Sequence, residues 1–461
     1  MSNTAARRPG TRTGRPPGNV FRRALGAFLL LLLYDGAIRK WLLPGMEQIV
    51  FITKDALLLA ALLHAALGRR HKTPAMMQPV ARMLFTLYAV WAVLEMGNPA
   101  LPNLLVAIWG LKSHLLYASL VVLLPLAFRS LDEIFQVLAK IYPWAVIPVC
   151  SLAFAQLAAP PDSFINQQVK GGTEGTAYFG EASLVRVTGT FSYISGMAAF
   201  VEVATLLGIG LFMLGVRSRL FLAALGFALA ALPATGSRAV VAVVLLGSAI
   251  QLLSSFAARL IGLLSALRVA AALAILVAIS LSTQDAAWEA FAQRLEGSRQ
   301  DESRAATAFT NAFVFLDVAG ATGFGTGSAN LGAPALAKDM TPFSWLPGGG
   351  FGFEEESGRL VLELGLFGWM LSLGLRATLL LWAAALLMGG RTRAARTAAM
   401  LALPVMALAV HQGSGVFGAS FTPVYYWFCV ALLAMAEREH RQASPGGTRT
   451  PASPWREAGA R

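Results

Sequence analysis

Charged residues interrupt the first two long apolar runs of the sequence. Asp35, Arg39 and Lys40 lie in "LLLYDGAIRKWLLPG", and Lys54 and Asp55 lie in "FITKDALLLAALL" shortly afterwards. A charge inside a membrane is costly and normally faces the protein interior with a partner. A tight hairpin at "LPG" would bring Asp35 to the depth of Lys54, about 12–16 Å from the turn at 1.5 Å per residue.

This arrangement predicts a structural ion-pair clasp of Asp35, Arg39, Lys54 and Asp55. Asp35 and Arg39 have i,i+4 spacing and share one helix face, while Arg39 and Lys40 can extend toward the interface. The alternative hypothesis is that part of this network lines an outward-open cavity and binds an anionic substrate.

Five arginines follow in segments that we expect on the outer side of a membrane: Arg186, Arg238, Arg299, Arg304 and Arg359. Arginine presents a planar fork that matches phosphate and carboxylate. The alternative for each is a solvated charge. Arg238 stands out because it follows "TGS" at a predicted helix start, where free backbone N–H groups favour anions.

The run "EEESGRL" contains candidate acid–base residues, Glu355 and Glu356. Neighbouring carboxylates near an apolar phase can act as a general base, or they can complement a helix N-terminus. Glu202, Glu95 and Glu363 lie in or near apolar runs, and a buried, hydrogen-bonded structural role is favoured for them.

Other motifs give no soluble enzyme site. The glycine series "AGATGFGTGSANLG" follows no predicted strand, which argues against a nucleotide site, and indicates a turn-rich loop that lets the backbone approach a ligand. Lys112, His114 and His411 are isolated, with no metal-ligand spacing. The two cysteines lie in apolar runs, so no disulfide is expected. We expect neither a metal nor another cofactor.

The elements that position these residues are transmembrane helices. Of 461 residues, 56% are hydrophobic and only 13% are charged, the mean hydropathy is +0.62, and apolar runs of bilayer-spanning length recur. The sequence predicts an all-α polytopic membrane protein. Twelve spans are expected, the seventh short and the tenth long enough to tilt or to begin outside the bilayer: 22–43, 46–67, 80–97, 103–127, 133–158, 192–215, 219–234, 239–256, 262–281, 358–389, 397–411 and 416–436.

The charge distribution predicts the topology. Basic residues of the N-terminal segment and of every second connection mark the cytoplasmic side, which places both termini inside and two long loops, 159–191 and 282–357, outside. The second loop contains a predicted helix near 303–319. Residues 1–21 and 437–461 have the composition of disordered tails. Since topology explains most of the net charge of +13, nucleic acid is not an expected partner.

The order of motifs over residues 185–390 resembles the Wzy-type O-antigen polymerase and O-antigen ligase superfamily. "TGSR" at 235–238 is followed by two spans, an outer loop with spaced arginines, "GATGFGTGSAN", and a closing span "ESGRLVLELGLFGW". The charged "DGAIRKW" run is similar to a subset of exopolysaccharide polymerases. The number of predicted spans also fits this superfamily.

The resemblance implies a metal-independent glycosyltransferase at the outer face of the bacterial inner membrane. Its members transfer a glycan from undecaprenyl diphosphate to another lipid-linked repeat unit or to lipid A-core, with arginines holding the diphosphate. Arg238, Arg299 or Arg304, Glu363 and Gly365 match family positions. The ligases carry a histidine near the closing span, but here only glutamates stand at that place.

The resemblance favours a polysaccharide polymerase whose partners are the lipid-linked oligosaccharide, membrane lipid, a chain-length regulator and other polysaccharide assembly proteins. An O-antigen ligase is the first alternative. A lipid-linked oligosaccharide flippase or secondary transporter is the second, although such proteins often show internal repeats and the two halves of this sequence share no motif. A non-catalytic assembly partner is the third.

Overall fold

The computed structural model describes most of the chain. The described residues are 18–68, 77–169, 178–179, 184–283, 288–289, 292, 310, 312–330, 332–337, 356–411 and 421–443.

The first half of the chain forms helices with a few short interruptions. They are, in chain order, α1 (Gly18–Ala37), the π-helical turn η1 (Ile38–Leu42), α2 (Glu47–Leu67), α3 (Pro79–Leu94), the 3₁₀ turn η2 (Glu95–Gly97), α4 (Leu104–Leu115), the 3₁₀ turn η3 (Leu116–Ser119), α5 (Leu120–Ala127), α6 (Leu131–Ala158) and the 3₁₀ turn η4 (Phe164–Asn166). Polar caps begin several of these helices, since Gln78, Asn103 and Ser130 accept a backbone N–H of the first turn.

A two-residue antiparallel ribbon separates the two halves. Its strands are β1 (Tyr178–Phe179) and β2 (Leu184–Val185), with Tyr178 opposite Val185. The second half then contains α7 (Ile194–Met213), α8 (Arg219–Ala234), α9 (Arg238–Ala257), α10 (Leu263–Thr283), α13 (Ala333–Leu336), α14 (Glu356–Gly389), α15 (Arg393–His411) and α16 (Phe421–Gln442). Residues 312–319 are also helical, within the helix predicted near 303–319.

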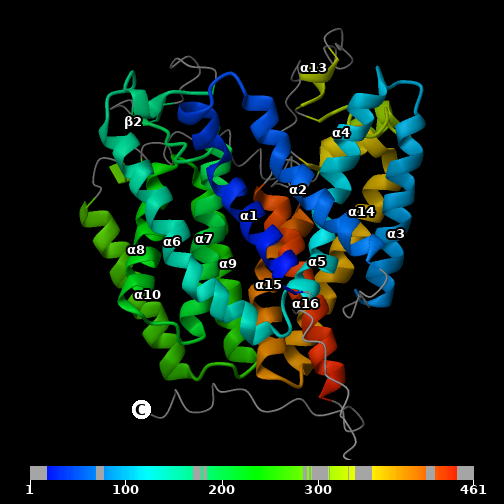
Figure 1. The fold of residues 1–461 in the computed structure, drawn as a ribbon. Coiled ribbons are helices and arrows are strands. Elements are labelled where there is room, and N and C mark those ends of the chain that lie inside the picture. Colours follow the sequence, from blue (N-terminus) through cyan, green and yellow to red (C-terminus); the bar gives the residue numbers. More distant parts are fainter. Residues whose placement is uncertain are drawn as a thin grey trace, which may run out of the picture.

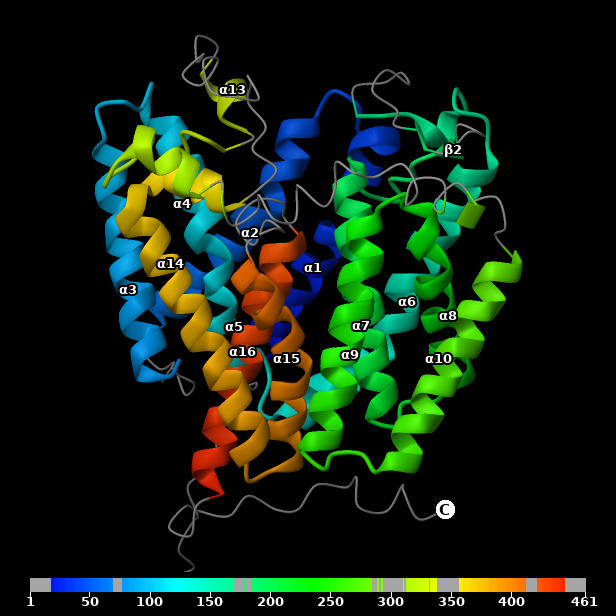
Figure 2. The same ribbon diagram turned by 180° about the vertical axis from the view of Figure 1, so that it is seen from behind.

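The helices stand side by side in one bundle, with two chemically different ends (Figures 1 and 2). Strand β2, α13 and the segment before α13 lie at one end, which we call the loop end. The connections α9–α10 and α14–α15, which carry Arg259 and Arg391, lie at the opposite end. The described parts of the long loops and these basic connections are thus at opposite ends, as the charge distribution predicts.

The all-α polytopic fold is confirmed. Each predicted span coincides with a helix or run of helices, and eight spans within the described part of the chain are long and apolar enough to cross a membrane. The other four are α1 and α16, which carry charges near their ends, and α8 and α10, whose apolar parts are shorter. Helix α1 begins at Gly18 and α16 continues to Gln442, so these parts of the predicted tails are helical.

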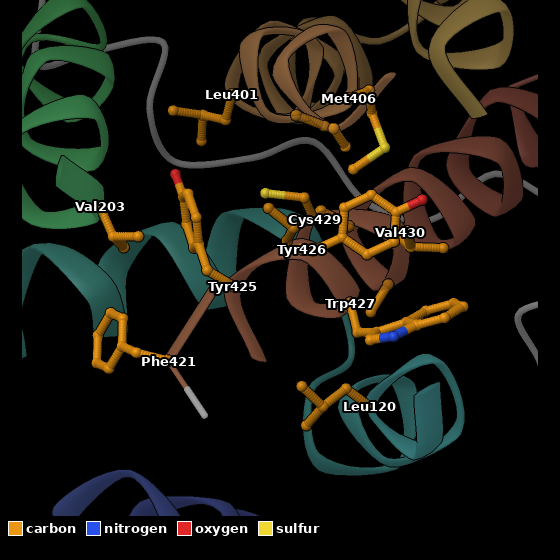
Figure 3. Close-up of a cluster of buried hydrophobic side chains, with 14 of the residues drawn as sticks. Leu120, Val203, Leu401, Met406, Phe421, Tyr425, Tyr426, Trp427, Cys429 and Val430 are labelled. Atoms are coloured by element: carbon orange, nitrogen blue, oxygen red, sulfur yellow. The ribbon is translucent and has the colours of Figure 1, made fainter. Parts of the chain in front are cut away.

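Helix α16 lies at the centre of the apolar core. Tyr426, Trp427, Cys429 and Val430 are almost completely buried, and Figure 3 shows them among side chains of α5, α7 and α15, including Leu120. A helix that is apolar on all sides is one that neighbouring helices surround. This helix therefore fixes the relative positions of the helices that carry the candidate site.

Helix α14 is broken at Gly365. This residue has φ 64° and ψ −167°, a combination open essentially to glycine alone. An unbroken helix would separate Glu356 from Arg376 by about 30 Å, yet their side chains form an ion pair at 2.7 Å. Residues 356–364 are therefore a separate short helix that folds back against the second part of α14.

Candidate functional site

The first two helices form the hairpin that the sequence predicts, with its charges paired inside. Lys54 Nζ lies 2.8 Å from Asp35 Oδ2, and Arg39 lies 3.8 Å from the same oxygen. Asp55 differs from the expectation, because it pairs with Lys112 Nζ of α4 at 2.7 Å and accepts a hydrogen bond from Tyr117. Lys112 thus belongs to this network, although the sequence did not indicate this because no charged residue lies near Lys112 in the chain.

Phe51 provides an aromatic surface between these cations. Its ring centroid lies 3.7 Å from Lys54 Nζ, 5.1 Å from Lys112 Nζ and 5.1 Å from the Arg39 guanidinium carbon. Cation–π attraction is strongest where water is excluded. The ring therefore offsets part of the repulsion among three neighbouring cations.

Lys40 is a buried cation that is bound by a hydroxyl group. Its side chain is 1% exposed and donates to the Thr188 hydroxyl at 2.6 Å, and no carboxylate among the described residues forms an ion pair with it. The neighbouring Arg39 donates to the hydroxyl of Ser192. Both cations lie in the π-helical turn η1, a local distortion that often occurs at functional sites.

Segment 184–192, which begins with strand β2 and turns at Gly189, organises this part of the loop end. Gln156 of α6 accepts the backbone N–H groups of Thr188 and Gly189, and Thr190 donates to the Leu33 carbonyl of α1 at 2.5 Å. The backbone of the segment also packs directly on Gly36, where any Cβ would clash with it. The segment is therefore held tightly between α1 and α6.

The same segment brings Arg186 to the "TGSR" corner. Arg186 Nε donates to the Thr235 carbonyl at 3.2 Å, and Arg238 is the first residue of α9, three positions later. Thr188, the hydroxyl partner of Lys40, lies two residues after Arg186 in the chain. Arg39 and Lys40 bond to this segment and Arg186 belongs to it, while Arg238 follows the corner that Arg186 contacts. We call these four residues the cation cluster.

A second buried polar group lies around Glu363 in the fold-back part of α14. Glu363 Oε2 accepts from His114 Nε2 at 2.7 Å and from the Gly327 N–H at 3.0 Å, and the Tyr88 hydroxyl lies 2.7 Å from His114 Nδ1. Glu363 Oε1 has no hydrogen-bond partner in the described structure and lies 3.9 Å from Arg359 Nε. Helix α4 contributes to both groups, because His114 contacts Glu363 and Lys112 pairs with Asp55 of the first network.

The predicted base Glu356 is held in an ion pair. Its carboxylate lies 2.7 Å from Arg376, both side chains are fully buried, and Arg376 also donates to the Ala409 carbonyl. This geometry favours a structural role for Glu356. Glu355, the other predicted base, lies outside the described residues.

The glycine series supports the fold around Glu363. Gly323, Gly325 and Gly327 all have positive φ, and Gly327 packs against the backbone of α4 at Gly110. The Gly327 N–H is the one that holds Glu363. In this part of the chain the glycine backbone therefore approaches another helix rather than open solvent.

The remaining candidate residues divide into three groups. Arg299 and Arg304 lie outside the described residues. Arg359, expected in an outer segment, is 3% exposed. Glu202 lines a small cavity of about 20 Å³ with Tyr425 and Tyr426, which is room for about one water molecule. The described residues contain no group of three or more acidic, histidine or cysteine side chains that could hold a metal.

The structure thus links Arg186 both to the segment that binds Arg39 and Lys40 and to the corner before Arg238, and places Arg359 in a separate polar group. The sequence signal for Lys40 and Arg39 was their position inside an apolar run, while Lys112, His114 and Tyr88 gave little signal because their partners are distant in the chain. No known family model matches this chain, and no curated protein matches it significantly.

Proposed function

We propose that this protein is a polysaccharide polymerase that joins lipid-diphosphate-linked oligosaccharide repeat units at the outer face of the bacterial inner membrane. The observation that carries the proposal is the buried Lys40 amine in the cation cluster, which bonds to a hydroxyl and to no carboxylate among the described residues. Helix η1 and segment 184–192 hold this amine in place.

A diphosphate fits this cluster chemically. Burying an unpaired charge is costly, and a bound anion would offset that cost. Arginine forks bind phosphate oxygens in pairs, whereas lysine acts as a point charge. The cluster contains both types at the loop end of a membrane bundle, where a lipid-linked headgroup would be present. The resemblance of residues 185–390 to the polymerase and ligase superfamily supports the same substrate class.

The reaction needs little more than orientation and charge stabilisation. An acceptor hydroxyl attacks the anomeric carbon of the donor glycan, the bond to the phosphate oxygen breaks, and lipid diphosphate leaves with the electron pair. The cation cluster stabilises the negative charge that develops on this leaving group. Such electrostatic stabilisation of the transition state is the largest contribution to the rate enhancement in many enzymes. No metal is required for these steps.

The sharpest test uses Lys40→Met. Methionine keeps the approximate length of the side chain but removes the buried charge, so the variant should fold at least as stably as the wild type. Loss of one charged contact to phosphate, worth about 1.5–3 kcal/mol, should weaken binding of undecaprenyl diphosphate about 10- to 150-fold. We would measure both properties on purified protein in nanodiscs.

Arg238→Ala should abolish long-chain polysaccharide in cells while protein levels stay normal. Arg22→Ala is the matched control, because Arg22 pairs with Glu133 far from the cluster. Full-length polymer in the Arg238→Ala strain would refute the proposed site.

Glycan profiles of a deletion strain separate the alternatives. Single repeat units that accumulate on lipid identify a polymerase. Polymer that remains lipid-linked and is not transferred to lipid A-core identifies a ligase. Repeat units trapped on the cytoplasmic leaflet identify a flippase, and would refute the proposal.

A further inference from the structure

The two carboxylate oxygens of Glu363 have different environments. Oε2 is held by His114 and by the Gly327 N–H, whereas Oε1 has no hydrogen-bond partner in the described part of the chain. The residue is 0% exposed. A buried carboxylate oxygen that lacks a donor is unusual in a native protein, and it indicates that another group supplies the missing hydrogen bond.

Arg359 presents the complementary groups at the same place. Its Nε and Nη2 atoms are buried and also lack hydrogen-bond partners among the described residues. The Nε–Oε1 distance of 3.9 Å is too long for a hydrogen bond between the two side chains. An acceptor atom and two donor atoms therefore remain unsatisfied side by side.

The charge of this group selects the kind of ligand. Arg359 and Arg376 are balanced by Glu363 and Glu356, whereas Lys40 has no carboxylate partner among the described residues. A balanced site has no preference for an added anion such as phosphate. A sugar hydroxyl fits it, because its O–H can donate to a carboxylate while its oxygen accepts from a guanidinium.

We propose that Arg359 and Glu363 form the acceptor subsite, in which Glu363 Oε1 removes the proton of the attacking sugar hydroxyl. This inference rests on the proposed function. Arg359 donates to the hydroxyl oxygen and orients it. As the oxygen–carbon bond to the donor glycan forms, the proton moves to Oε1. The bond to phosphate breaks, and the diphosphate held by the cation cluster takes the electron pair.

His114 and Tyr88 position the base. In a neutral imidazole, Nε2–H donates to Glu363 Oε2, which leaves Nδ1 to accept from the Tyr88 hydroxyl. The Gly327 N–H provides a second fixed donor to Oε2. Both contacts leave Oε1 as the oxygen available to the substrate.

The test uses Glu363→Gln in purified, reconstituted protein, with lipid-linked repeat units extracted from a deletion strain as substrate. Removal of a general base typically lowers the rate about 100- to 10,000-fold, and we expect a loss in this range for chain elongation. Binding of undecaprenyl diphosphate, which lacks a sugar acceptor, should stay within about twofold of the wild type. Glu133→Gln is the matched control, since Glu133 lies in the first turn of α6 and pairs with Arg22.

Arg359→Lys gives an independent measurement should Glu363→Gln fold poorly. Lysine keeps the charge but loses the fork, so elongation should fall at least tenfold while undecaprenyl diphosphate binding is retained. If Glu363→Gln elongates chains at the wild-type rate, the acceptor subsite is overturned, while the proposed function is not. Should Glu363→Gln fail to fold, a wild-type elongation rate in Arg359→Lys has the same consequence. A wild-type protein that neither binds undecaprenyl diphosphate nor elongates repeat units would overturn the proposed function and this inference together.

Discussion

The substitution Gly365→Ala tests the break in α14 directly. Gly365 has φ 64° and ψ −167°, and a Cβ at this position would overlap the Ala321 carbonyl and come within 2.5 Å of the Thr322 nitrogen. The obstacles are backbone atoms, fixed because Leu366 and Phe324 bond to Gly320 and Leu362 across the break. Neither the dihedral angles nor the neighbouring backbone can adapt without cost.

The expected destabilisation follows from two contributions. A residue forced into this region of dihedral space costs about 1–3 kcal/mol, and overpacking in a tight core costs about as much again, so we expect about 2–6 kcal/mol in total. If the fold-back opens instead, the buried Glu356–Arg376 pair separates, and breaking such a pair costs about 3–5 kcal/mol. Either outcome lowers the free energy of unfolding markedly.

The assay is thermal unfolding of detergent-solubilised protein, followed by fluorescence-detected size exclusion. Gly374→Ala is the matched control in the same helix. Its added methyl group would meet only the Leu84 side chain at 3.8 Å, and alanine favours a helix over glycine by up to about 1 kcal/mol. A Gly365→Ala protein as stable as the Gly374→Ala protein would refute the described break.

Three further predictions concern other contacts, each measured by the same unfolding assay. Lys54→Met should destabilise the protein by about 3–5 kcal/mol because it leaves Asp35 buried without its closest partner. Adding Asp35→Asn should recover most of this loss. A double variant that is no more stable than Lys54→Met alone would contradict the clasp. Gly110→Ala should destabilise by at least about 1–3 kcal/mol, because the methyl group would meet the backbone of the glycine loop; unchanged stability would contradict that packing. Arg22→Ala should change stability by no more than about 1 kcal/mol, since its pair with Glu133 is partly exposed; a larger loss would show that this contact fixes the helix ends.

Much of the helical fold was predictable, because an apolar run of about 20 residues indicates a transmembrane helix and gives its approximate bounds. The short helix α8 (Arg219–Ala234) coincides with its predicted range. The break at Gly365 was not predictable, since transmembrane helices tolerate glycine and the run 358–389 is mostly apolar on both sides of it. Only contacts with the segment around Gly320, far earlier in the chain, fix the positive φ.

The site was predictable only where its partners are close in sequence. The Asp35–Lys54 pair follows from a hairpin of known length and 1.5 Å of rise per residue. The Asp55–Lys112 pair joins helices 57 residues apart, and a sequence pattern gives no depth or rotation for the second helix. The burial of Arg359 was missed for the same reason, because an arginine before an apolar run resembles an interfacial residue until the chain is known to fold back.

The long-range contacts of η1 have a consequence for biosynthesis. Arg39 and Lys40 bond to residues 153 and 148 positions later in the chain. At about 5–20 residues per second of translation, these partners emerge about 7–30 s after the hairpin is made. During this time Arg39 and Lys40, which become buried in the folded protein, lack their hydroxyl partners. We therefore expect the nascent hairpin to rely on the membrane insertion machinery or on anionic lipid headgroups until segment 184–192 arrives.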